Sequence, residues 1–350
     1  MFVKNPGFGR LPQGERLGKL QKSPNYKNGS FHNITPAPPI IGNKRNILWS
    51  LLEFSFRHIE GLRPKDRIPT IKTNIKGLNP SDNLAIWLGH SSIYMQLDGK
   101  KILVDPVFVI ASPISIFNRA FKGSDVYKPK DIPEIDYVII THDHWDHLDY
   151  NTIVQIKNRV KTFICPLGVG EHLEYWGIDK KHIIELDWWE SAKLDNNITV
   201  NCSPARHFSG RSIKNRNSTL WASYVIQSPA GSIFLSGDTG YDSHFRDIKN
   251  KFGDIKLAFM ENGQYDEQWK YIHLMPKDFI KAVKDIRPDT LITIHNSKYA
   301  LARHKWEEPL NNAIIAAKEN HFNLLTPMIG QIINISTNNN TFKNWWQDIK

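Results

Sequence analysis

The nine residues Thr141–Asp149 constrain this chain more than any other stretch. They read Thr-His-Asp-His-Trp-Asp-His-Leu-Asp and follow an apolar, β-branched run at 137–140 that is typical of a buried strand. Side chains alternate along an extended chain, so three polar groups can project to one side and a fourth can join them where the chain turns. These four candidate metal ligands are His142, His144, Asp146 and His147. Imidazole and carboxylate groups are the usual ligands of Zn2+ and related ions, and this spacing offers two ligand pairs for two adjacent metals. A histidine-rich polar loop is the alternative, but burying four such groups without a metal would be costly.

The length and composition are those of an ordinary globular protein. With 350 residues, the chain is long enough for one large domain or two medium ones, and 40% of its residues are hydrophobic and 23% charged. The formal net charge of +10 is compatible with a phosphate-bearing partner, such as nucleic acid, an anionic lipid surface or a phosphodiester. Because the basic residues are spread along the chain, a solvated basic surface is the favoured explanation for most of the individual lysines.

The two cysteines and the N-terminal sequence indicate the cellular compartment in which the protein is expected. Cys165 and Cys202 lie in strand-like contexts and are expected to be buried free thiols rather than a disulfide framework. No apolar run follows Lys4, and no window approaches the roughly 20 apolar residues that span a bilayer. The sequence therefore predicts a cytoplasmic protein without a signal peptide or transmembrane segment, although a chain whose leader had been removed would look the same.

Residues 1–60 are expected to form an N-terminal arm rather than a domain of their own. The first 45 residues are rich in Gly, Pro, Asn and Lys, which predicts an extended segment wrapped around the domain 61–350. Residues 47–57 place several apolar side chains on one helical face. This helix can pack on the core, or it can lie at a lipid surface, where Trp, Phe and flanking basic residues are favoured.

Strand-like and helix-like stretches follow one another from residue 84 onward, which indicates an α/β fold. In the second half, three single polar residues stand just after strand-like stretches, where loops of α/β folds carry functional groups. These residues are His207, Asp238 and His295. Each alone could be an ordinary polar residue, but together with the four candidates above they complete two four- or five-coordinate sites. The apolar loop 107–121 is either a lid over a pocket for an apolar ligand or part of the core.

These motifs resemble a known superfamily. The 141–149 motif, Gly-Asp-Thr-Gly-Tyr at 237–241 and the late strand ending in His295 resemble the metallo-β-lactamase superfamily. Five further stretches are similar to N-acyl-phosphatidylethanolamine-hydrolysing phospholipase D and its bacterial relatives: 87–92, 104–106, 185–190, 219–221 and 269–273. The similarity covers about residues 84–310. It implies the αββα four-layer sandwich of that superfamily, with a catalytic domain at 61–350 behind an extended N-terminal arm.

The resemblance also implies two zinc ions and a metal-bridging hydroxide. It assigns one zinc to His142, His144 and His207, and the other to Asp146, His147 and His295, with Asp238 bridging both. Asp146 is expected to accept a hydrogen bond from the hydroxide as well. His273 is expected to bind a phosphate oxygen or to protonate the leaving alkoxide, the alternative being a surface histidine. Three groups are expected to orient the ligand imidazoles: His90, Asp105 and Asp149.

The function that this resemblance implies is a zinc-dependent phosphodiesterase of the phospholipase D type. Its expected partner is a phospholipid or a small phosphodiester substrate, with peripheral membrane contact and a homodimer as further options. A lactonase or carboxylic-ester hydrolase is the first alternative, because a metal-activated hydroxide also attacks carbonyls. A nuclease is a weaker alternative, since the apolar loop 107–121 and the lack of a basic domain do not suit a nucleic-acid groove. A metal-stabilised scaffold without activity is the non-enzymatic alternative.

Overall fold

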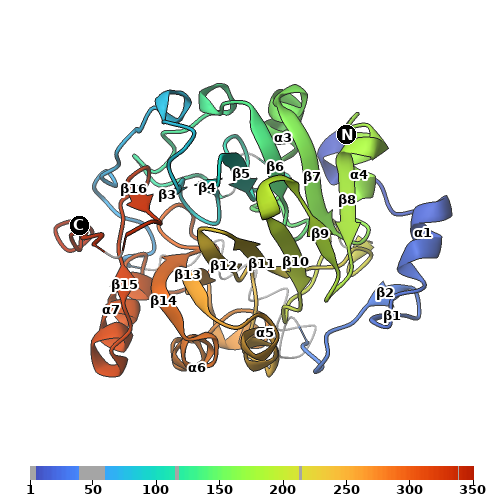
Figure 1. The fold of residues 1–350 in the computed structure, drawn as a ribbon. Helices are drawn as coiled ribbons and strands as arrows, with labels where there is room; N and C mark the ends of the chain where they lie inside the picture. The colour runs from blue at the N-terminus through green and yellow to red at the C-terminus, as the bar shows by residue number, and fades with distance from the viewer. Residues whose placement is uncertain (1–4, 39–59, 115–117, 213–214, 338) are drawn as a thin grey trace.

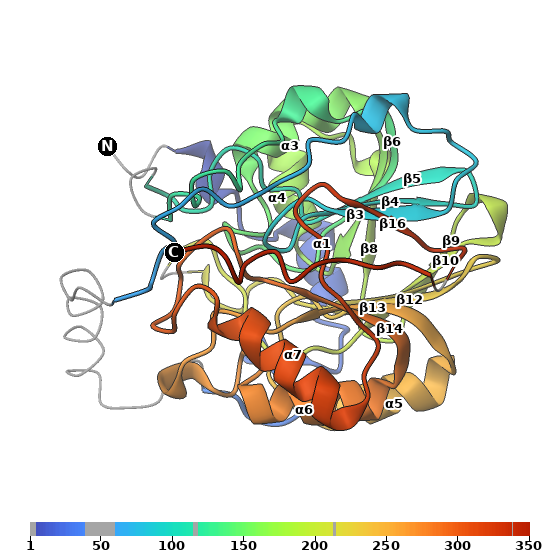
Figure 2. The same ribbon diagram turned by 90° about the vertical axis from the view of Figure 1, so that its left-hand side faces the viewer.

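The computed structural model describes residues 5–38, 60–114, 118–212, 215–337 and 339–350. Two seven-stranded sheets face each other, and helices cover their outer faces (Figures 1 and 2). One apolar core fills the space between the sheets, and a second lies between the second sheet and the helices beneath it. The αββα four-layer sandwich predicted from the sequence is therefore confirmed.

The first sheet begins as an antiparallel meander and continues as a parallel run. Its strands follow the order β16 (Ile332–Asn334), β3 (Leu84–Trp87), β4 (Ile93–Leu97), β5 (Lys100–Val104), β6 (Ile135–Ile139), β7 (Val160–Pro166) and β8 (Ile183–Leu186). Strands β5 to β8 pair in parallel, so helices α3 (Tyr150–Ile156) and α4 (Gly170–Tyr175) carry the crossovers. Between β4 and β5, Asp98 and Gly99 both have positive φ, as the predicted two-residue hairpin requires.

The second sheet has the same mixed construction. Its order is β15 (Leu324–Leu325), β14 (Pro288–Ile294), β13 (Ile255–Glu261), β12 (Gly231–Leu235), β11 (Ser223–Ser228), β10 (Thr199–Ser203) and β9 (Ser191–Lys193). Strands β9 to β12 are antiparallel, and β12 to β15 are parallel. Helices α5 (His244–Phe252), α6 (Pro276–Ile286) and α7 (Glu308–Asn320) cover its outer face (Figure 2). The predicted helix 276–286 is confirmed, and Pro276 in its first turn favours its start there.

The N-terminal arm is not extended throughout. It contains helix α1 (Gly14–Leu20) and a small hairpin of β1 (Tyr26–Lys27) and β2 (Ser30–Phe31). The prediction of an extended segment is therefore wrong for residues 14–20. These residues contain no proline, so the local sequence permits a helix, and the full burial of Leu20 in the core stabilises it. The helix predicted at 47–57 lies outside the described residues. No helix in the described ranges is long and apolar enough to cross a membrane.

The ends of several strands bring the polar residues of the sequence motifs to one edge of the sandwich. Asp105 follows β5, and the loop 141–149 follows β6. In the second sheet Asp238 follows β12, while His295 directly follows β14. Because parallel strands present their carboxyl ends at the same edge, residues far apart in sequence meet there.

Candidate metal centre

Three histidines form the first half of the centre. His142 Nε2 lies 2.9 Å from His144 Nδ1, and His207 Nε2 lies 3.2 Å from the same nitrogen. Two of these residues come from the loop after β6 and the third from the loop after β10. Burial and the neighbouring imidazoles hold the pKa of His142 well below its usual value, so this ring stays in the neutral form that binds metals.

The second half combines carboxylates with two further histidines. Asp146 Oδ2 lies 3.4 Å from His295 Nε2 and 3.8 Å from His147 Nε2. Asp238 Oδ1 lies 3.2 Å from His147 Nε2, and Asp238 Oδ2 lies 3.2 Å from His295 Nε2. The same Oδ2 is 3.8 Å from His207 Nε2, so Asp238 stands between the two halves.

The hydrogen bonding of these groups tests whether metal ions fit. His147 Nε2 and Asp238 Oδ1 are buried and lie 3.2 Å apart, yet neither makes a hydrogen bond of good geometry with any described residue. Buried polar atoms of this kind are costly unless a ligand satisfies them. Although burial opposes it, His147 and His295 hold the pKa of Asp238 well below its usual value, which keeps the carboxylate charged. Converging nitrogen and carboxylate donors suit divalent cations. The buried His and Asp clusters therefore indicate a binuclear metal site.

Asp105 lies behind one of the candidate ligands, as the sequence predicts. Its Oδ2 is 2.7 Å from His147 Nδ1, and Thr141 donates hydrogen bonds to both of its carboxylate oxygens. This arrangement fixes the ring so that Nε2 points at Asp238. Thr141 was not singled out by the sequence, yet it holds Asp105 in place.

The other two expected orienting residues have different partners. His90 Nε2 lies 2.9 Å from the carboxylate oxygen Oδ2 of Asp146, so its partner in the centre is a carboxylate rather than an imidazole. Asp149 caps helix α3: it accepts hydrogen bonds from the N–H of Asn151, the hydroxyl of Thr152 and the N–H groups of Val109 and Ile110. The expectation that Asp149 orients a ligand imidazole is therefore wrong. The first N–H groups of a helix have no partner within the helix, and the Asp149 carboxylate accepts hydrogen bonds from such a group here.

His273 lies at a cavity beside the candidate ligands, with Glu261 behind it. The cavity has a volume of about 240 Å³, and its apolar wall consists of Phe208, Trp269, Ile272 and Leu301. Glu261 is fully buried at the end of β13, and its Oε2 is 2.7 Å from His273 Nδ1. Sequence reasoning missed Glu261. The available signal was an acidic residue at the end of an otherwise apolar strand, beside two strands that deliver Asp238 and His295.

Comparisons with known proteins agree with this geometry. Residues 100–296, more than half of the chain, match the family model described as beta-lactamase superfamily domain. The chain belongs to this superfamily. It is 35% identical to an uncharacterised protein of Mycobacterium tuberculosis over 332 residues, which cover 93% of this chain and 88% of that protein. The recognition of the superfamily from sequence motifs is thus confirmed, and with the buried His and Asp clusters it makes the protein a metal-dependent hydrolase.

Two further relatives show how far the likeness extends. N-acyl-phosphatidylethanolamine-hydrolyzing phospholipase D 1 of Caenorhabditis elegans is 31% identical over 234 residues, which cover 62% of this chain and 64% of the worm protein. The solved structure of a metallo hydrolase from the archaeon Ignicoccus hospitalis superposes with a TM-score of 0.54 at 18% identity, over 72% of this chain and 97% of that one. The latter shows that the two proteins share the superfamily fold.

Part of the loop 107–121 packs on the protein, whereas Val109 is 50% exposed. Val107, Phe108 and Phe121 are buried, and Val107 packs with Ala111 and Tyr299. The alternative of core packing is therefore confirmed for these residues, whereas 115–117 lie outside the described part.

Gly240 allows a close approach of two loops in the centre. A Cβ atom at this position would overlap the carbonyl oxygen of Tyr271, which precedes the segment that carries His273. We expect Gly240→Ala to destabilise the protein by about 1–3 kcal/mol, because backbone must move to admit the methyl group. Urea denaturation measures the change. Gly18→Ala is the control, since no described atom lies within 4 Å of its Cβ position and alanine favours the helix α1. Equal stability of Gly240→Ala and the unaltered protein would contradict the prediction.

Proposed function

We propose that this protein is a dinuclear zinc phosphodiesterase of the phospholipase D type, acting on N-acylated ethanolamine phospholipids or related phosphodiesters. The observation that carries the proposal is the position of Asp238 between two groups of buried ligands, beside a cavity with one apolar wall. The likeness to the worm phospholipase D over 62% of the chain supports this substrate class.

The proposed ligand sets follow the two halves of the centre. One zinc ion would be held by His142, His144 and His207, the other by Asp146, His147 and His295, with Asp238 shared. When bound, a pair of divalent ions lowers the pKa of coordinated water and neutralises charge on phosphoryl oxygens. The residues of the chain must then hold protons and orient the substrate.

Asp146 and His273 are the proposed catalytic residues. Asp146 Oδ2, held by His90 at 2.9 Å, is placed to accept a hydrogen bond from the attacking water. His273 Nδ1 is paired with Glu261, which leaves Nε2 for a phosphate oxygen or for the proton that the leaving alkoxide needs. The apolar residues Phe208, Trp269 and Leu301 would contact the apolar portion of the substrate and exclude water from it.

A comparison of three substrates tests the proposal. Zinc-loaded protein would be incubated with an N-acyl phosphatidylethanolamine in mixed micelles, with bis-p-nitrophenyl phosphate and with a lactone. We expect hydrolysis of the phosphodiesters, and a loss of at least about 100-fold in Asp146→Asn, because the amide is a poorer ligand and proton acceptor. Asp254→Asn, a change of the same chemistry at an exposed position, is the control. Hydrolysis of the lactone alone would contradict phosphodiesterase function, and full activity in Asp146→Asn would contradict the site.

A further inference from the structure

The N-terminal arm lies against the loop that carries most of the candidate ligands. Pro6 accepts a hydrogen bond from the Trp176 indole at 2.8 Å, and the carbonyl of Gly7 accepts one from Arg211 Nε at 2.6 Å. Phe8 contacts the ring of Trp145, which is part of the 141–149 motif, with ring centroids 5.3 Å apart. The beginning of the arm is therefore packed directly on the metal-site loop.

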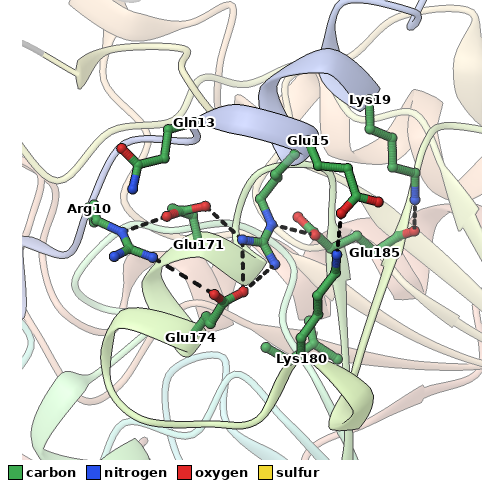
Figure 3. A pocket seen from close by; sticks show the side chains of 10 residues that line it. Arg10, Gln13, Glu15, Lys19, Glu171, Glu174, Lys180 and Glu185 are labelled. Carbon is green, nitrogen blue, oxygen red and sulfur yellow. Dashed lines mark hydrogen bonds and ion pairs between the residues drawn. The ribbon is translucent and has the colours of Figure 1, made fainter.

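A buried cluster of ion pairs holds helix α1 in place (Figure 3). Arg16 lies 2.6 Å from Glu171, 2.7 Å from Glu185 and 3.1 Å from Glu174. Its side chain is only 9% exposed, and those of Glu171 and Glu185 are 2% and 11% exposed. Because these glutamates belong to α4 and β8, the arm is fixed to the first sheet before it crosses to the second.

After the hairpin β1–β2, the arm reaches the backbone of His207. Asn33 Nδ2 donates to the carbonyl of His207 at 2.8 Å, and Asn33 Oδ1 accepts from the N–H of His207 at 3.1 Å. The same oxygen accepts from the Trp221 indole at 3.2 Å. One amide side chain thus satisfies both backbone groups of a candidate ligand that is 174 positions away in sequence.

The His207 ring is fixed from a second side as well. Its Nδ1 lies 2.8 Å from the carbonyl oxygen of Ile272, so Nε2 is the nitrogen that faces His144. The Ile272 contact fixes the tautomer and the tilt of the ring, while the Asn33 contacts fix the backbone from which the ring projects. Other hydrogen bonds hold the loop at Arg206, Ser209 and Gly210, so loss of the Asn33 contacts would loosen the backbone at His207 itself.

We propose that Asn33 is a positioning residue for His207, and that the arm thereby helps to hold one candidate metal ligand in place. This inference rests on the proposed function, which assigns His207 to one of two zinc ions. It predicts that changes at Asn33 alter mainly the affinity of one ion, because the hydrogen bonds of Asn33 in the described ranges go to His207 and Trp221 and not to Asp146, His147 or His295.

Zinc binding by the full-length protein tests the inference. Zinc-loaded protein would be equilibrated in buffers of fixed free Zn2+, and bound zinc would be counted to obtain two affinities. We expect Asn33→Ala to weaken one affinity by 10- to 100-fold, the range known for residues that orient a metal ligand, with the other unchanged. Asn33→Asp, which keeps the oxygen acceptor and loses the donor, should weaken it less. With Co2+ in place of zinc, the visible spectrum should change for one site alone.

Asn25→Ala is the matched control, since Asn25 lies on the same arm and the hydrogen bonds found for it in the described ranges use its backbone. Unchanged affinities in both Asn33 variants would overturn the inference, and so would an equal loss at both ions or an equal loss in Asn25→Ala. If Asn33→Ala does not fold, Asn33→Asp decides by the same criteria. Fewer than two zinc ions in the unaltered protein would instead contradict the proposed function.

Discussion

Asp238→Asn is expected to reduce bound zinc from two ions per chain to one and to abolish most turnover. Asp238 is the residue whose two carboxylate oxygens lie 3.2 Å from His147 and from His295, and it also lies near His207 in the other half. An amide offers one neutral oxygen, so it cannot bridge two cations. Loss of several kcal/mol of charge stabilisation corresponds to a drop in turnover of about a thousand-fold. Metal analysis and phosphodiesterase assays measure the two effects.

The control for this change separates chemistry from folding. Asp254→Asn alters an exposed carboxylate and should retain two zinc ions and full turnover. Thermal unfolding of the zinc-free proteins measures the folding contribution separately. Asp238→Asn should lower the zinc-free unfolding temperature, because this carboxylate pairs with His147 and His295 when no metal is bound. Two tightly bound zinc ions and undiminished turnover in Asp238→Asn would disprove the bridging role.

Arg16→Met is expected to lower the free energy of unfolding by about 3–5 kcal/mol, the usual result of removing one partner from a buried ion pair. The change leaves Glu185, which is 11% exposed, without a cation, whereas Glu171, which is 2% exposed, keeps only its pair with Arg10. Methionine replaces the aliphatic stem of the arginine side chain, so the loss of charge pairing dominates over the loss of packing. Urea denaturation of the zinc-free protein gives the free energy without a contribution from metal binding.

Lys180→Met removes a cation from an ion pair at the exposed edge of the same cluster. The pair of Lys180 with Glu15 is exposed at both ends, at 63% and 86%, so water already solvates both charges. Its removal should leave the denaturation midpoint unchanged within error. Similar midpoints for Arg16→Met and Lys180→Met would show that the buried cluster does not hold the arm.

The local sequence was sufficient to predict those features that depend on residues close together in the chain. The loop 141–149 could be recognised because four candidate ligands are close in sequence and follow a strand whose residues are almost entirely apolar. The helix 276–286 and the hairpin at 98–99 were likewise predicted from residues that act on their own backbone, a first-turn proline and a turn glycine.

Prediction from sequence was less accurate where a side chain contacts a residue that is distant in the sequence. Asp105 and Asp149 look alike as aspartates near the motif, but one supports His147 and the other caps a helix. Glu261 stood unremarked in a strand, although it holds His273. In the arm, α1 is stabilised by the burial of Leu20 and by the ion pairs of Arg16 with three glutamates. Helix propensity, which depends only on local sequence, does not include these tertiary contacts.

The sequence by itself determined the superfamily, the α/β class and the seven candidate ligands, because residue type, spacing and position after a strand are local properties. The resemblance already implied two sets of ligands around Asp238. Only the tertiary structure decided which groups lie behind these ligands and that Asn33 of the arm contacts His207. Distances of about 3 Å between residues more than a hundred positions apart follow from how the two sheets pack, and no single stretch of the chain contains that information.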